Sequence, residues 1–106
     1  LALAYSAYAT SNSQALRKAA ADTLVKAFLA TGHPARAVYV ARAAARWAPD
    51  KQGRWIRLGI VEAAAGNVEK AIDAFQKGVA LSPQNELARS ARKQIKRLKE
   101  QTSDRQ

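Results

Sequence analysis

Apolar residues recur along most of the chain at the spacing of an α-helix. Between residues 55 and 83, Trp55, Leu58 and Gly59 fall on one side of a first helix. After Gly66, a second apolar stripe comprises Val68, Ala71, Ile72, Phe75 and Val79. Neither stripe can be buried by its own helix, so the pattern predicts two helices that close on each other as an antiparallel pair.

The same pattern occurs 34 residues earlier. This interval separates Gly32 from Gly66 and Leu24 from Leu58. It also separates Ala37 from Ala71, Val38 from Ile72 and Pro49 from Pro83. Self-similarity at a fixed period of this size predicts an all-α solenoid of stacked, antiparallel helix pairs.

The residues at the repeated positions resemble the tetratricopeptide repeat (TPR) family. Its pattern is W-x2-L-G-x2-Y, then G, then A-x3-F, a small residue and a final P. The second copy fills it with Trp55, Leu58, Gly59, Gly66, Ala71, Phe75 and Pro83. The first copy keeps Leu24, Phe28, Gly32, Ala37, Ala44 and Pro49. The expected core of the repeats comprises Leu24, Phe28, Ala37, Trp55, Leu58, Gly59, Ala71, Phe75 and Pro83.

Both copies depart from the family pattern. The second has Glu62 in place of Tyr and Gly78 in place of Ala. The first has Ala21 for Trp, Val25 for Gly and Ala41 for the large aromatic. Each copy therefore supplies one phenyl ring, Phe28 or Phe75, from opposite helices of the pair, an exchange that keeps core volume nearly constant.

Residues 1–106 are expected to form one domain. Its segments are a remnant of a preceding repeat (1–12), repeat 1 (14–49), repeat 2 (50–83), a capping helix (84–101) and a frayed tail (102–106). Residues 1–12 have an alternative interpretation, because Ala7-Tyr8-Ala9 has the small-x-small form that ends a secretory signal. Asp50 and Asn67 are expected to cap the two helices of repeat 2.

The composition of the chain argues against several kinds of chemistry and indicates no specific one. The chain has no cysteine, and its one histidine, His33, falls in a turn, so the sequence indicates no metal site and no cofactor. No pair of carboxylates has a spacing suited to acid–base catalysis, and no glycine-rich phosphate loop is present. The formal charge is +10, from 18 basic and 8 acidic residues. This balance favours anionic partners, or simply a solvated basic surface.

The family resemblance implies a non-catalytic module that binds a protein or peptide in the concave groove lined by the first helix of each pair. Four residues are expected there: Ile56 and Ile60 as an apolar floor, with Lys26 and Arg57 at the rim. This combination suits an acidic and hydrophobic peptide. The alternative is that these side chains only contact a neighbouring repeat.

The last helix is amphipathic and strongly basic. Leu87, Ala91, Ile95 and Leu98 form its apolar side, and its basic residues are Arg89, Arg92, Lys93, Lys96, Arg97 and Lys99. Three interpretations remain open: a solvating cap for the array, a site for an acidic protein, or a surface for nucleic acid or an anionic membrane. Self-association through the N-terminal end is a further option, because Leu16, Ala20 and Leu24 would lack cover there.

Overall fold

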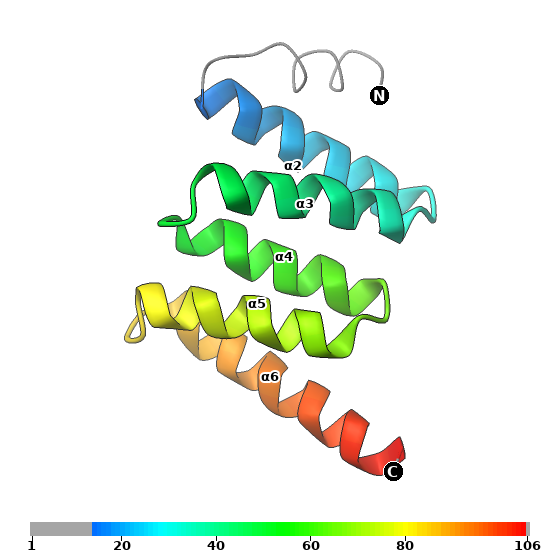
Figure 1. Cartoon of the computed structure of the whole chain (residues 1–106), viewed down its shortest axis with the longest axis vertical. Helices are drawn as coiled ribbons and strands as arrows, with labels where there is room; N and C mark the ends of the chain where they lie inside the picture. Colours follow the sequence, from blue (N-terminus) through cyan, green and yellow to red (C-terminus); the bar gives the residue numbers. More distant parts are fainter. Residues whose placement is uncertain (1–13, 106) are drawn as a thin grey trace.

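The computed structural model describes residues 14–105, and Figure 1 shows them as a stack of helices. The remnant expected over residues 1–12 lies outside the described residues. Within residues 14–105 the helices are α2 (Gln14–Ala30), α3 (Pro34–Trp47), α4 (Gln52–Ala64), α5 (Val68–Leu81) and α6 (Glu86–Arg105). These described residues contain no strand, so the predicted all-α repeat architecture is confirmed. None of the described helices is long and apolar enough to cross a membrane.

Each helix packs chiefly on its neighbours in sequence (Figure 1). The pairs α2–α3 and α4–α5 are the two predicted repeats, and α3 joins them by packing on α4. The last helix, α6, covers α5 and touches α4. The chain therefore forms a linear stack, in which contacts between elements distant in sequence are few.

Glycines end the first helix of each pair. Gly32 and Gly66 have φ angles of 77° and 85°, in the left-handed region where glycine carries no steric penalty. The following amide then turns back to the helix: His33 N donates to Phe28 O at 2.7 Å, and Asn67 N donates to Glu62 O at 2.9 Å. The two turns are therefore alike.

Two apolar clusters run through the stack. The first draws most of its residues from α2, α3 and α4, including Leu24, Phe28 and Leu58, and one, Ala74, from α5. The second draws residues from α4, α5 and α6, including Ile56, Ala71, Phe75, Ala91 and Leu98. Because α4 contributes to both clusters, neither repeat has a core of its own.

Two of the expected core residues are not fully buried. Trp55 is half-buried and packs against the first cluster from outside. Its indole Nε1 donates to Pro49 O at 2.9 Å, and the Lys77 ammonium lies 4.8 Å from its ring centroid. This position suits an indole, whose polar edge needs a partner. Pro83 is exposed in the turn before α6, where it ends a helix rather than filling the core.

Repeat 2 is closely packed at two glycines. A Cβ atom built on Gly59 would lie 2.6–2.8 Å from three ring atoms of Phe75, and one built on Gly78 would lie 2.6 Å from Ile56 Cδ1. The absence of a side chain at these two positions lets Phe75 and Ile56 enter the space between α4 and α5.

The start of α6 differs from the expected position. The helix begins at Glu86 instead of residue 84, and Asn85 caps it by accepting a hydrogen bond from Ala88 N at 3.0 Å. It extends to Arg105, so residues 102–105, expected to be frayed, are helical. Leu87 is exposed, although the sequence pattern placed it on the packed side.

One glutamine joins three helices. Gln52, the first residue of α4, donates through Nε2 to Gly78 O and Ser82 O at the end of α5, both at 2.9 Å. Its Oε1 accepts a hydrogen bond from Asn85 Nδ2, at 2.6 Å, just before α6. The beginning of α4 is thereby fixed to the end of α5 and to the cap of α6.

We expect Gly59→Ala to lower the free energy of unfolding by about 1–3 kcal/mol, because the methyl group overlaps the buried Phe75 ring. Gly53→Ala is the matched control in the same helix, since a Cβ there meets nothing within 4 Å. That control should leave stability unchanged or raise it by up to about 1 kcal/mol. Urea unfolding of both variants measures the difference. Equal stability of the two would contradict the tight packing at Gly59.

Candidate functional site

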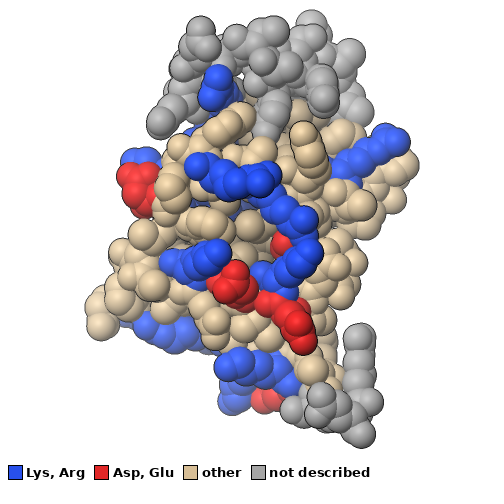
Figure 2. Space-filling model, viewed as in Figure 1, with Lys and Arg blue, Asp and Glu red and all other residues tan. Residues whose placement is uncertain are grey.

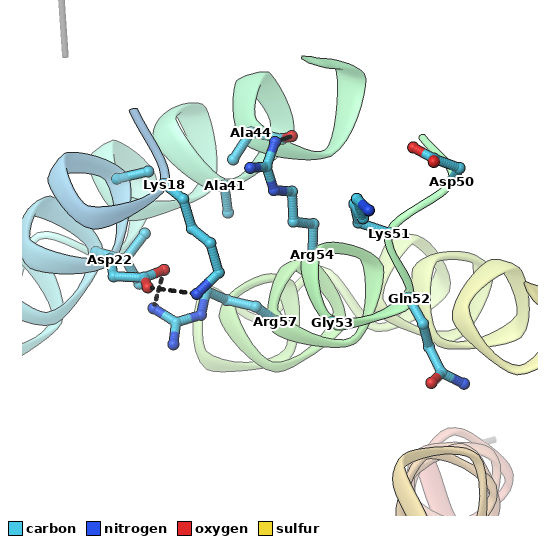
Figure 3. Close-up of a pocket in the computed structure, with 12 residues that line it drawn as sticks. Lys18, Asp22, Ala41, Ala44, Asp50, Lys51, Gln52, Gly53, Arg54 and Arg57 are labelled. Carbon is cyan, nitrogen blue, oxygen red and sulfur yellow. Dashed lines mark hydrogen bonds and ion pairs between the residues drawn. The ribbon is translucent and has the colours of Figure 1, made fainter. Parts of the chain in front are cut away.

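A pocket of about 580 Å³ lies between α2 and the beginning of α4, with α3 forming its floor. Figure 3 shows side chains from these elements around it. Small apolar residues, Ala21 and Val25 of α2 and Ala41 and Ala44 of α3, supply the apolar surface. Polar and charged residues or glycine complete the lining: Lys18, Asp22, Asp50, Lys51, Gln52, Gly53, Arg54 and Arg57.

The charged groups of the pocket are partly arranged by one carboxylate. Asp22 Oδ1 lies 3.0 Å from Arg57 Nη1, and its Oδ2 lies 3.5 Å from Lys18 Nζ (Figure 3). Arg54 is held differently, because its Nη1 donates to Ala44 O at 3.1 Å near the end of α3. Four basic and two acidic side chains line the pocket, so its rim carries an excess of positive charge.

The pocket includes one of the four residues that the sequence predicts for a groove. Arg57 lines the pocket, whereas Lys26 and Ile60 are exposed but lie outside its lining. Ile56 does not line the pocket either: its side chain is 7% exposed and packs toward Gly78 in the second apolar cluster. The physical reason is the open space at Gly78, which draws Ile56 between α4 and α5.

Sequence reasoning missed the contribution of α3 and of the loop before α4. The signal was present in the departures from the repeat pattern, because Ala21 and Ala41 stand where that pattern has large aromatic residues. Phe28, expected to make up the volume missing at Ala41, packs in the first cluster and does not line the pocket. Missing volume at two positions of one helix pair is a sign of a cavity, since well-packed interiors leave few voids.

A second polar feature is an ion pair between the two repeats, in which the carboxylate is buried and the guanidinium is partly exposed. Glu62 of α4 is 2% exposed. Its carboxylate accepts hydrogen bonds from Arg42 of α3, Nε at 2.9 Å and a second guanidinium nitrogen at 3.0 Å. Asn67 Nδ2 donates a third bond at 2.9 Å. Asn67 occupies the capping position of α5, as predicted, but its side chain binds Glu62 and forms no hydrogen bond with the helix. Asp50 does not cap α4, because the capping position is Lys51.

These contacts set the protonation of the pair. Burial by itself would raise the pKa of Glu62, but the hydrogen bonds from Arg42 and Asn67 outweigh it and the pKa lies below its ordinary value. The hydrogen bond to Glu62 also raises the pKa of Arg42. Both groups are therefore charged at neutral pH, and they connect the second helix of repeat 1 to the first helix of repeat 2.

The basic side chains of α6 fall into two groups. Arg89 Nη1 lies 2.8 Å from Glu86 Oε1, and Arg92 Nη2 donates to Pro83 O at 2.6 Å. Lys93, Lys96, Arg97 and Lys99 are exposed and form no ion pair with the described residues. Figure 2 shows separate groups of basic side chains on the face seen in Figure 1, with fewer acidic ones between them.

The sequence also predicted that apolar residues near the N-terminal end of the stack would lack cover. Ala20 and Leu24 are buried, so these two residues are not short of cover at the N-terminal side of the stack. The side chain of Leu16 lies outside the described ones. Among the residues that the structure describes, no cluster of three or more His, Cys, Asp or Glu could hold a metal ion.

The sequence was compared with models of known protein families. A family model described as "Tetratricopeptide repeat" matches residues 28–95, which is more than half of the chain. The chain therefore belongs to the tetratricopeptide repeat family. Repeats of this family generally mediate protein–protein interactions and generally act as non-catalytic scaffolds. A search of curated proteins found no match.

Acidification should weaken the Arg42–Glu62 connection. Since the folded-state pKa of Glu62 lies below its ordinary value of about 4.3, its contribution to stability is complete above that pH. The contribution is lost as pH falls through the folded-state pKa. We expect Glu62→Gln to be less stable than the unmodified protein at pH 7, by about 1–3 kcal/mol, and the two to converge in acid.

Urea unfolding between pH 7 and pH 3 measures this convergence. Glu69→Gln is the control, because Glu69 is exposed on α5, and it should run parallel to the unmodified protein. A constant difference between Glu62→Gln and the unmodified protein over the whole pH range would show that the ion pair does not supply the stability.

Proposed function

We propose that the protein binds an acidic segment of a partner protein in the pocket between α2 and α4. The observation that carries this proposal is the combination of an apolar floor, formed by α3 and α2, with a positively charged rim. Apolar pockets with a few oriented polar groups are the usual form of a ligand site. The family's general role in protein–protein interaction makes a polypeptide the favoured ligand.

The basic side chains at the rim of the pocket differ in whether they already have a partner within the protein. Arg57 and Lys18 already share Asp22, and Arg54 is bound to the Ala44 carbonyl. Lys51 is exposed in the loop before α4, and its side chain forms no hydrogen bond or ion pair with residues 14–105. A carboxylate of the partner can pair with Lys51 without breaking an existing contact. It can also join the Lys18 and Arg57 cations beside Asp22.

Charge reversal at the rim provides the test. Lys51→Glu should weaken binding of the peptide fluoresceinyl-Glu-Glu-Phe-Glu-Glu-amide, labelled at its N-terminal amine, about threefold to tenfold at 50 mM salt, because a rim cation becomes an anion. Fluorescence anisotropy measures the affinity. The Lys51 ammonium has no partner among the described residues, so the melting temperature should stay unchanged.

Lys26→Glu is the matched control for this experiment. It makes the same charge change on the same protein, but Lys26 does not line the pocket. An equal effect of the two variants would mean that only the overall charge of +10 attracts the peptide. In that case the pocket would not be the binding site.

A second candidate function is binding of nucleic acid or an anionic membrane through α6. The observation that favours it is a group of four exposed basic side chains, Lys93, Lys96, Arg97 and Lys99. None of them forms an ion pair with another described residue. Arg89 and Arg92 are less available, because each is bound within the chain. The absence of aromatic residues between these cations gives no means of stacking on bases.

If α6 is such a surface, a variant with all four of these residues changed to Gln should lose binding to a 20-base-pair duplex and to phosphatidylserine vesicles. Each phosphate contact contributes to the salt dependence, so the unmodified protein should still bind at 150 mM salt if the surface is specific. Binding that disappears by that concentration, or that survives in the variant, contradicts this second function.

A further inference from the structure

The two repeats differ at the pocket in a systematic way. In repeat 2, Phe75 is 1% exposed and packs in the second cluster with Ile56 and Ala91, with its ring against Gly59. The residues 34 positions earlier are Ala41, Asp22, Arg57 and Val25. All four of these line the pocket. The pocket is therefore the repeat 1 counterpart of the space that Phe75 fills in repeat 2.

Three large apolar side chains of repeat 2 have small or charged counterparts in repeat 1. Trp55, Ile56 and Phe75 correspond to Ala21, Asp22 and Ala41. Each of these three counterparts lines the pocket. An aromatic ring is thus missing from a site whose equivalent, in the same protein, holds one against the same helix faces.

We propose that this pocket receives an aromatic side chain of the partner, which takes the place that Phe75 occupies in repeat 2. The inference rests on the proposed function and specifies its ligand: an aromatic residue flanked by carboxylates. The ring would lie on Ala21, Val25, Ala41 and Ala44, and the flanking carboxylates would meet the rim cations Lys18, Lys51 and Arg57. The charge of +10 disfavours a second copy of this chain as the occupant.

Two peptides separate the aromatic anchor from the charge attraction. The probes are acetyl-Glu-Glu-Phe-Glu-Glu-amide and acetyl-Glu-Glu-Ala-Glu-Glu-amide, titrated at 50 mM salt and followed by calorimetry. Burial of a phenyl ring predicts that the Phe peptide binds at least about tenfold more tightly. Equal affinity of both peptides would overturn the aromatic anchor and leave the acidic groove intact. Binding of neither peptide would reject both proposals.

A filled variant tests the location. Val25→Gly/Ala41→Phe reproduces the Gly59 and Phe75 pair of repeat 2, so the new ring should occupy the pocket without overlap. We expect this variant to fold, with unchanged helical circular dichroism, and to lose the preference for the Phe peptide. Val25→Gly alone leaves the pocket open and should keep the preference. A filled, folded variant that still prefers the Phe peptide would overturn the location.

Two further measurements address a double variant that does not fold and a ligand that is not a polypeptide. If the double variant fails to fold, Ala21→Leu fills the pocket from α2 and should reduce the preference for the Phe peptide in the same way. Free indole distinguishes a polypeptide ligand from a small aromatic molecule. Binding of indole with no binding of the Phe peptide would overturn the proposal in favour of a small-molecule pocket.

Discussion

The structure depends on the burial of apolar helix faces that no single helix pair can cover. The helix α4 shows this most clearly, because one of its sides enters the cluster with α2 and α3 and another enters the cluster with α5 and α6. A helix that serves two cores cannot be displaced without exposing both. The linear order of the stack, the position of the pocket and the placement of the Arg42–Glu62 pair all follow from this sharing.

Much of the fold could be predicted from the interval of 34 residues and the helical spacing of apolar residues. Leu24, Ala37, Leu58 and Ala71 are buried where that spacing places them. The direction of Ile56 could not be predicted in the same way, because it depends on the space beside Gly78, on another helix. Trp55 is a different case: its position in the pattern indicates packing, but its polar edge keeps it at the surface, bound to Pro49 O.

Polar contacts between helices were the least predictable feature. Glu62 stands at a position where the repeat pattern has an aromatic residue, and its main partner, Arg42, lies 20 residues away in the other repeat. No local spacing connects these two residues. Only the stacking of α3 on α4 brings the guanidinium to the carboxylate. The pocket was hard to predict for the same reason, because its lining combines residues of three helices and a loop. The sequence pattern pointed only to one face of the first helix of each repeat.

The Gln52 side chain has a consequence for how the C-terminal half of the molecule opens. Its hydrogen bonds tie the start of α4 to the last turn of α5 and to the residue that caps α6. Detachment of α6 would break the bond to Asn85 and uncover the second cluster at the same time. Repeat 2 and α6 should therefore open together as one cooperative unit, with similar protection of their amides against hydrogen exchange.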